Sequence, residues 1–165
     1  MLRAKLLTAV AANNSGGGGG AHIFWRQLVT DTHNIPGAYR YEAAEIEFLG
    51  AQGEDFCTTV GGTPTASESA FSIYPISNAF DRDNTTAYLT ANSVTGDIFV
   101  QFEFSSAVEI KSFAFTCEDS SNRIDRTAKD FKIQYSDDGV NWTTVHTVTN
   151  DPELTSPSER RVYSW

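Results

Sequence analysis

Residues 131–145 read FKIQYSDDGVNWTTV, and this stretch determines the fold class. Phe131, Ile133 and Tyr135 alternate with polar residues, which is the period-two pattern of a half-buried β-strand. The Ser-Asp-Asp-Gly sequence at 136–139 favours a tight turn, because Asp side chains bond to nearby backbone amides and Gly tolerates positive φ. The stretch therefore predicts a β-strand that ends in a tight turn.

The same alternation recurs along the chain. Further alternating runs occur at residues 23–29, 45–48, 98–104 and 113–117. Turn-forming pairs stand between the runs, among them Pro36-Gly37, Gly61-Gly62 and Gly96-Asp97. Many short strands separated by turns, with no convincing helical pattern and no internal repeat, predict an all-β fold of the β-sandwich type.

Composition supports one β-rich domain and excludes some partners. The chain has 165 residues, with 18 Thr and 15 Ser against 7 Leu and 4 Lys, a bias that suits strands and turns. Hydrophobic residues make up 40%, enough for a core. Asp and Glu number 21 against 12 Lys and Arg, so the formal charge is −9. This charge opposes binding to nucleic acid or to an anionic membrane surface, and no stretch approaches the roughly 20 apolar residues of a membrane span.

The first 20 residues differ from the rest in composition. Residues 1–12, MLRAKLLTAVAA, place two basic residues before an apolar run. This pattern is either a short signal peptide or a tail that anchors the protein to a partner. Residues 13–20 end in five glycines and predict a flexible linker. The domain is expected to span residues 21–165.

Catalytic and redox signals are weak. The three histidines have no spacing that fits a zinc site, and no nucleophile motif is present, so we do not expect an enzyme. Cys57 and Cys117 are either two buried thiols, which we favour, or one disulfide. The segment 77–88, SNAFDRDNTTAY, gathers oxygen donors at Asp81 and its neighbours. It fits either a hard-cation site or an Asx-rich turn that binds its own amides.

Three segments together resemble one family. Residues 77–88 resemble the A-F-D-G-D-x-x-T-x-W loop of discoidin domains, also called F5/8 type C domains, and of the similar family-32 carbohydrate-binding modules. Residues 131–145 resemble the family's Y-x-I-x-Y-S-D-D-G-x-x-W-T-x-V hairpin, and residues 98–104 occupy the place of its W-I-x-V-D-L-G strand. The resemblance covers roughly residues 22–165 and implies a discoidin-like jelly-roll β-sandwich.

The order of the strands departs from the usual family pattern. The segments FWRQL at 24–28 and AEIEF at 44–48 resemble a strand pair that closes the domain in most members, whereas here they open it. Such an order indicates a circular permutation, which a sandwich tolerates when its termini lie close together. Permuted domains of this layout resemble those of tailed-phage virion proteins.

The resemblance also implies a structural calcium ion. Carried over residue by residue, the side-chain ligands are Asp81, Thr86 and Glu45, and the carbonyl ligands belong to Asn78, Asp83, Thr86 and Ala44. These oxygens suit calcium, which takes six to eight of them. The ion would hold the loop to the strand of Glu45. Arg82 stands where the family usually has Gly, and Tyr88 where it usually has Trp.

Family members bind sugars, and in some branches lipids or proteins, through loops at one end of the sandwich. Sugar sites combine an aromatic side chain with polar donors and acceptors. The candidates here are His33, Asn34, Tyr39 and Tyr41 in the 31–42 loop, Tyr74 near Pro75, and Asn122, Arg123 and Arg126 in the 118–128 loop. Trp25 and Trp142, which stand in strand motifs, are expected to be core residues.

The resemblance favours a noncatalytic carbohydrate-binding module of a phage virion structural protein, in capsid decoration or associated with the tail. Residues 1–12 would attach it to capsid or tail proteins, and the domain would be displayed toward host or environmental glycans, as a monomer or a homo-oligomer. Two alternatives stay open. One is a purely structural cement or decoration protein of the virion. The other is a secreted carbohydrate-binding module, which requires cleavage of residues 1–12.

Overall fold

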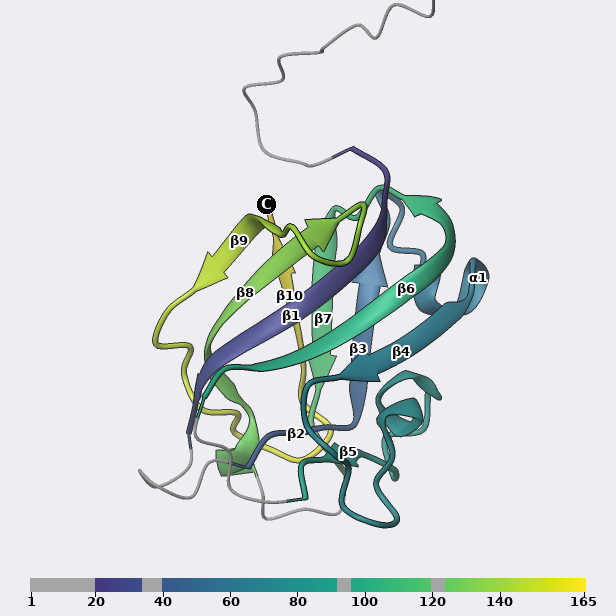
Figure 1. Ribbon diagram of the computed structural model, residues 1–165. Helices are drawn as coiled ribbons and strands as arrows, with labels where there is room; N and C mark the ends of the chain where they lie inside the picture. The colour runs from purple at the N-terminus through teal and green to yellow at the C-terminus, as the bar shows by residue number, and fades with distance from the viewer. Residues whose placement is uncertain (1–19, 34–39, 92–95, 120–123) are drawn as a thin grey trace, which may run out of the picture.

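The structure, a computed structural model, describes residues 20–33, 40–91, 96–119 and 124–165. Two antiparallel sheets face each other (Figure 1). The larger sheet contains, in spatial order, β4 (Gly62–Ala66), β6 (Ile98–Val108), β1 (His22–Thr32), β8 (Ala128–Ser136) and β9 (Thr143–Val148). The smaller sheet contains β10 (Arg160–Ser164), β7 (Ser112–Thr116) and β3 (Glu45–Leu49). A two-stranded ribbon pairs β2 (Glu42–Ala43) with β5 (Tyr88–Leu89).

Helical segments are short. They are α1 (Phe56–Thr59) and the two 3₁₀ turns η1 (Ile76–Phe80) and η2 (Ile124–Arg126). Asp55 caps α1, since its carboxylate accepts a hydrogen bond of 3.0 Å from the Cys57 backbone N–H. Among the described residues, every helix is too short or too polar to span a bilayer.

The core lies between the two sheets and is rich in aromatic rings. Phe48 of β3 packs against Phe113 of β7 at 5.6 Å between ring centroids and against Phe104 of β6 in the opposite sheet at 6.2 Å. Phe113 also reaches Phe131 of β8 at 6.0 Å. Each fully buried ring of this kind stabilises the fold by about 1.5–3 kcal/mol. The all-β sandwich expected from the alternating runs is confirmed.

The 131–145 stretch forms the β8–β9 hairpin. Phe131 pairs with Val148 and Tyr135 with Thr143, and Gly139 in the turn has φ of +71°. The Asp138 carboxylate accepts hydrogen bonds from the backbone N–H groups of the two residues after the glycine, at 2.9 and 2.7 Å. These hydrogen bonds lower the pKa of Asp138 below its usual range. The predicted strand and turn are both confirmed.

The two tryptophans expected in the core occupy different environments. Trp25 is fully buried between the sheets. Trp142 is only half-buried and lies on the outer face of the larger sheet, where the Arg26 guanidinium stands 3.9 Å from its ring centroid. A core role for Trp142 is therefore wrong. Trp142 stands in the hairpin connection just before β9, and its ring packs against the Arg26 guanidinium.

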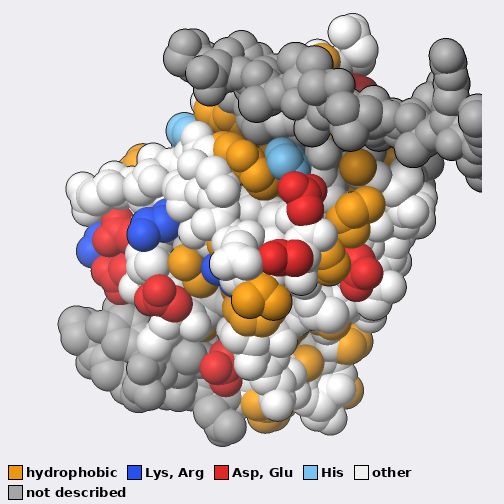
Figure 2. Space-filling view, turned by 45° about the horizontal axis from the view of Figure 1, so that its top comes forward, with side chains coloured by type: hydrophobic (Ala, Val, Ile, Leu, Met, Phe, Trp, Pro, Cys, Tyr) orange, Lys and Arg blue, Asp and Glu red, His pale blue; other side chains and the backbone are white. Residues whose placement is uncertain are grey.

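A buried hydrogen bond and two buried thiols also lie within the sandwich. The Tyr41 hydroxyl donates a hydrogen bond of 2.6 Å to Gln27 Oε1, and both side chains are fully buried. Cys57 and Cys117 are free and buried, as favoured from the sequence. On the face shown in Figure 2, Asp and Glu side chains are scattered among neutral and hydrophobic ones, and Lys and Arg gather at one side next to acidic groups.

Candidate functional site

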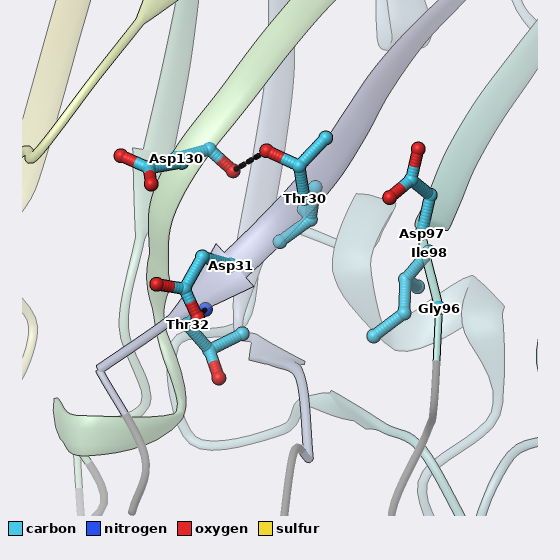
Figure 3. A pocket seen from close by; sticks show the side chains of 8 residues that line it. Thr30, Asp31, Thr32, Gly96, Asp97, Ile98 and Asp130 are labelled. Carbon is cyan, nitrogen blue, oxygen red and sulfur yellow. Dashed lines mark hydrogen bonds between the residues drawn. The ribbon is translucent and has the colours of Figure 1, made fainter. Parts of the chain in front are cut away.

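A cavity of about 410 Å³ opens at one end of the larger sheet (Figure 3). It forms because neighbouring strands end at different levels. The pairing of β1 with β6 ends at Val29 and Ile98, whereas β1 continues alongside β8 to the pair Thr32 and Ala128. The segment before β6 is therefore not paired with the last residues of β1, which follow Val29. The described lining residues are Val29, Thr30, Asp31, Thr32, Gly96, Asp97, Ile98 and Asp130.

Three aspartates line this cavity, and Asp130 presents its backbone carbonyl to Thr30, whose Oγ1 donates to it at 3.1 Å, while its carboxylate points away from Asp97 (Figure 3). Asp31 of β1 and Asp130 of β8 are cross-strand partners, an arrangement that brings like charges together. Lys129 offsets part of this repulsion, since its Nζ lies 3.2 Å from Asp31 Oδ2. The backbone N–H of Asn150 donates to the Asp130 carboxylate. Asp97 is exposed and has no hydrogen bond or ion pair with another described residue.

The cavity has a definite chemical preference. Its polar groups are carboxylates and the hydroxyls of Thr30 and Thr32, and its apolar part comes from Val29 and Ile98. Ionised carboxylates only accept hydrogen bonds, so they suit ligands that carry hydroxyl or ammonium donors and they repel anions. A small polyhydroxy compound meets both requirements, because it has hydroxyl donors and an apolar C–H face.

Sequence reasoning missed Asp31, Asp97 and Asp130 as site residues. They belong to three separate segments, and only the strand register brings them to one cavity. The nearest signal was the turn pair Gly96-Asp97, which marked a loop without indicating its neighbours.

A second site is formed by the 81–86 loop, which follows η1. Asp81 Oδ2 accepts a hydrogen bond of 2.8 Å from Thr86 Oγ1, and Asp81 Oδ1 accepts one of 2.8 Å from the Asp83 backbone N–H. The Asp83 carbonyl in turn accepts from the Thr86 backbone N–H at 2.9 Å. These bonds close a compact loop that gathers oxygen atoms of Asp81, Asp83 and Thr86.

Glu45 of β3 faces this loop. Glu45 is only 6% exposed. Its Oε1 atom is buried and has no hydrogen-bond partner among the described residues. The pKa of Glu45 is raised from 4.5 to about 8, chiefly by burial and then by the nearby Asp81, while backbone N–H groups of Asp83 and Arg82 oppose the rise. The structure thus brings together Glu45 and Asp81, two of the side-chain ligands that the resemblance implied.

The donor set fits a hard cation if carbonyl and hydroxyl oxygens take part. Throughout the described ranges, no three His, Cys, Asp or Glu side chains converge as a metal site. The Asp83 carboxylate bonds to Thr85, at 3.0 Å to its N–H and 2.6 Å to its Oγ1, which leaves the Asp83 carbonyl as the candidate ligand. Those Thr85 hydrogen bonds lower the pKa of Asp83. The orphaned Glu45 oxygen is the observation that favours a cation here.

The remaining implied ligands lie beside this loop. Asn78 donates through Nδ2 to the Ala87 carbonyl at 3.1 Å, and the Ala44 backbone N–H donates to the Thr116 carbonyl at 3.0 Å. Tyr88, at the position where the family usually has Trp, is buried and donates its hydroxyl to the Glu68 carbonyl at 2.9 Å. Tyr88 therefore keeps an aromatic ring in the core, and its hydroxyl is hydrogen-bonded.

The glycan candidates from the sequence have mixed outcomes. Tyr41 is fully buried, so its side chain has no surface to offer a sugar, and this prediction is corrected. Arg126 lies 3.3 Å from the buried Glu42 carboxylate, which commits its guanidinium to an ion pair. His33 and Tyr74 are half-buried, and burial lowers the pKa of His33. The other four candidates, Asn34, Tyr39, Asn122 and Arg123, lie outside the described residues.

Comparison with known proteins identifies the family. The model of the F5/8 type C domain matches residues 63–163, which is more than half of the chain and runs from β4 through β10. Comparison with curated proteins and with solved structures gave no match. The all-β sandwich and this match agree, and the chain belongs to the F5/8 type C domain family.

Proposed function

We propose that this chain is a noncatalytic glycan-binding module and that its ligand occupies the cavity lined by Asp31, Asp97 and Asp130. The family match supports the class of function, because F5/8 type C domains are generally binding modules. The carrying observation is the cavity itself, in which carboxylates and hydroxyls stand beside an apolar wall. Because three aspartates line it, neutral and amino sugars are the proposed ligands, and sulfated or carboxylated sugars would be repelled.

We also propose a structural calcium ion at the 81–86 loop. When bound, calcium would supply positive charge between the carboxyl groups of Glu45 and Asp81. The side chains of Glu45, Asp81 and Thr86 would hold it, together with carbonyl oxygens of the loop and its neighbours. The buried, unpartnered Glu45 oxygen supports this assignment. The ion would tie the loop to β3 and would take no part in glycan contacts.

The proposed setting is a tailed-phage virion, with residues 1–12 bound to capsid or tail proteins. The supporting observation is the strand order. The family match begins at residue 63, yet β1 fills the centre of the larger sheet and β3 an edge of the smaller one. Strands that precede the matched segment thus complete both sheets, as a circular permutation requires. Secretion as a carbohydrate-binding module is the alternative setting.

A second candidate function is attachment to protein, as a cement or decoration subunit. It is favoured by Phe71 and Ile73, which are 44% and 72% exposed on the loop between β4 and η1. Exposed apolar groups of this kind mark protein contacts. Ile73→Ser would abolish co-sedimentation with purified virions if this loop attaches the protein, and it would leave sugar binding unchanged.

A glycan array tests the proposal. The full chain is applied to neutral, amino and acidic glycans, once in calcium and once in EDTA. The proposal predicts binding to neutral or amino glycans and none to acidic ones. Absence of binding to every glycan in both conditions would overturn the glycan-binding function and leave the protein-attachment function.

A further inference from the structure

Arg82 adopts a backbone conformation that L residues avoid. Its φ is +64°, in the left-handed region that glycine tolerates at no cost. Three further non-glycine residues with positive φ, Ser72, Asn150 and Ser158, are recorded among the described residues. The backbone strain of an Arg at such a position lowers the free energy of unfolding. Contacts of its side chain must compensate for this loss.

The side chain of Arg82 reaches a different element. One guanidinium nitrogen donates a hydrogen bond to Thr58 Oγ1 of α1 and lies 3.5 Å from Asp55 Oδ2. Asp55 is itself 8% exposed and caps α1 through its other oxygen. The contact therefore joins the 81–86 loop to the first turn of α1, and it gives a buried carboxylate its neighbouring cation.

The other tethers of the loop do not replace this contact. The Asn84 carbonyl accepts a hydrogen bond of 2.9 Å from the Asp119 backbone N–H, which holds the far side of the loop. On the near side, the backbone N–H groups of Arg82 and Asp83 face the Glu45 carboxylate of β3. The Arg82 guanidinium is the described group that ties this side of the loop to a second element, α1, through Thr58 and Asp55.

We infer that Arg82 is a positioning residue that fastens the 81–86 loop to α1, so that the loop keeps its oxygen arrangement before any cation binds. A glycine at this position would relieve the backbone but would leave the loop to be ordered by the cation alone. The loop in this chain is thus pre-organised by a protein contact. The inference holds with or without calcium, so its test is separate from the calcium proposal.

Arg82→Gly tests the inference, because the two interpretations of Arg82 predict opposite changes in the thermal unfolding midpoint. If Arg82 merely occupies the position, Arg82→Gly removes strain and raises the thermal unfolding midpoint. If it fastens the loop, Arg82→Gly lowers the midpoint by a few degrees in EDTA. Ser158→Gly is the matched control, since Ser158 is exposed with φ of +58° and has no ion pair in the described structure, and its midpoint should rise or stay constant.

Hydrogen exchange locates the effect. In EDTA, Arg82→Gly should speed exchange several-fold at the backbone N–H groups of Asp83, Thr85 and Thr86, which the loop hydrogen bonds protect, and leave the β8–β9 hairpin unchanged. Unchanged exchange at these three amides, or a midpoint that rises as in Ser158→Gly, would overturn the inference.

A double-mutant cycle that combines substitutions of Arg82 and Asp55 tests whether the two residues stabilise the protein through one shared contact. Asp55→Asn keeps an oxygen to cap α1 and removes only the charge that faces Arg82. The inference predicts that the effects of Arg82→Gly and Asp55→Asn on stability are not additive, because each removes the same contact. Should Arg82→Gly fail to fold, Thr58→Val removes the hydroxyl that accepts from Arg82, together with the hydrogen bond of 3.0 Å that this hydroxyl donates to the Asp55 carbonyl, and it must still speed exchange in the loop. Additive effects, or normal exchange in Thr58→Val, would contradict the inference.

Discussion

Asp31 of β1 and Asp130 of β8 stand directly opposite each other across the strand pair, at a bulge that lines the 410 Å³ cavity. Like charges in this position destabilise a sheet. A sequence selected only for stability would not place two Asp residues here, and the proposed ligand gives them a role as hydrogen-bond acceptors. The charge repulsion in the sheet and the proposed ligand contacts therefore involve the same two residues.

The first prediction concerns this pair. Asp130→Asn keeps an oxygen for the Asn150 backbone N–H and removes the repulsion with Asp31, so the free energy of unfolding should rise by about 0.2–1 kcal/mol. Urea unfolding measures it. Asp97→Asn is the control and should leave stability unchanged, because Asp97 is exposed and has no cross-strand partner in the described structure. A loss of stability in Asp130→Asn would contradict the repulsion.

The second prediction concerns pH. In EDTA, the pKa of Glu45 is raised to about 8 in the folded protein, so between its ordinary value near 4.5 and 8 the folded state binds more protons than the unfolded state. Stability should fall as the pH rises through this window and should level off above it. Glu45→Gln should flatten this dependence, whereas Glu47→Gln, whose parent carboxylate already pairs with Arg160, should not. An unchanged pH profile in Glu45→Gln would refute the assignment.

The third prediction separates the carboxylates of the loop. Added calcium should raise the thermal midpoint of the full chain by an amount that grows with the logarithm of its concentration above the dissociation constant. Asp81→Asn should abolish this rise, because Asp81 is a proposed side-chain ligand. Asp83→Asn should keep it, because within the described ranges the Asp83 carboxylate bonds only to Thr85, and the carbonyl remains. If both variants lose the response equally, the assigned ligand set is wrong.

The fourth prediction compares the two tryptophans. Trp25→Ala should lower the free energy of unfolding by about 3–5 kcal/mol, since it leaves a cavity between the sheets. Trp142→Ala should cost only about 0.5–2 kcal/mol, the range of a cation–π contact, because the ring lies on the outer face over Arg26. Equal losses in guanidinium unfolding would show that Trp142 is as deeply packed as Trp25.

Local patterns were sufficient to predict the sandwich. Alternation at residues 98–104 and 131–135 reflects which face of each strand is buried, so it identified β6 and β8 directly. The family resemblance of residues 77–88 and 44–48, rather than a local pattern, implied that Glu45 would lie near Asp81, and the structure places the two carboxyl groups together. Register and orientation were not accessible. Tyr41 looked like a loop residue, but its hydroxyl has a partner on β1 and the whole side chain is buried.

The cavity could not be predicted for the same reason. Asp31, Asp97 and Asp130 are separated in sequence by 66 and 33 residues and share no motif. They meet because β6 begins opposite Val29 while β1 continues along β8, and strand lengths of this kind depend on tertiary pairing. Arg82 is an intermediate case. Its unusual position was visible in the sequence, whereas its contact with Asp55 required the fold.

Calorimetric titration of the best neutral or amino glycan from the array tests the central claim most directly. The titration compares the unmodified chain with Asp97→Asn and with Asp137→Asn, whose parent residue follows β8 at the opposite end of the strand from Asp130. We predict that Asp97→Asn weakens binding by roughly 10- to 100-fold, the value of a hydrogen bond to a charged group, and that Asp137→Asn has no effect. Binding by Asp97→Asn as tight as that of the unmodified chain would show that the cavity is not the glycan site.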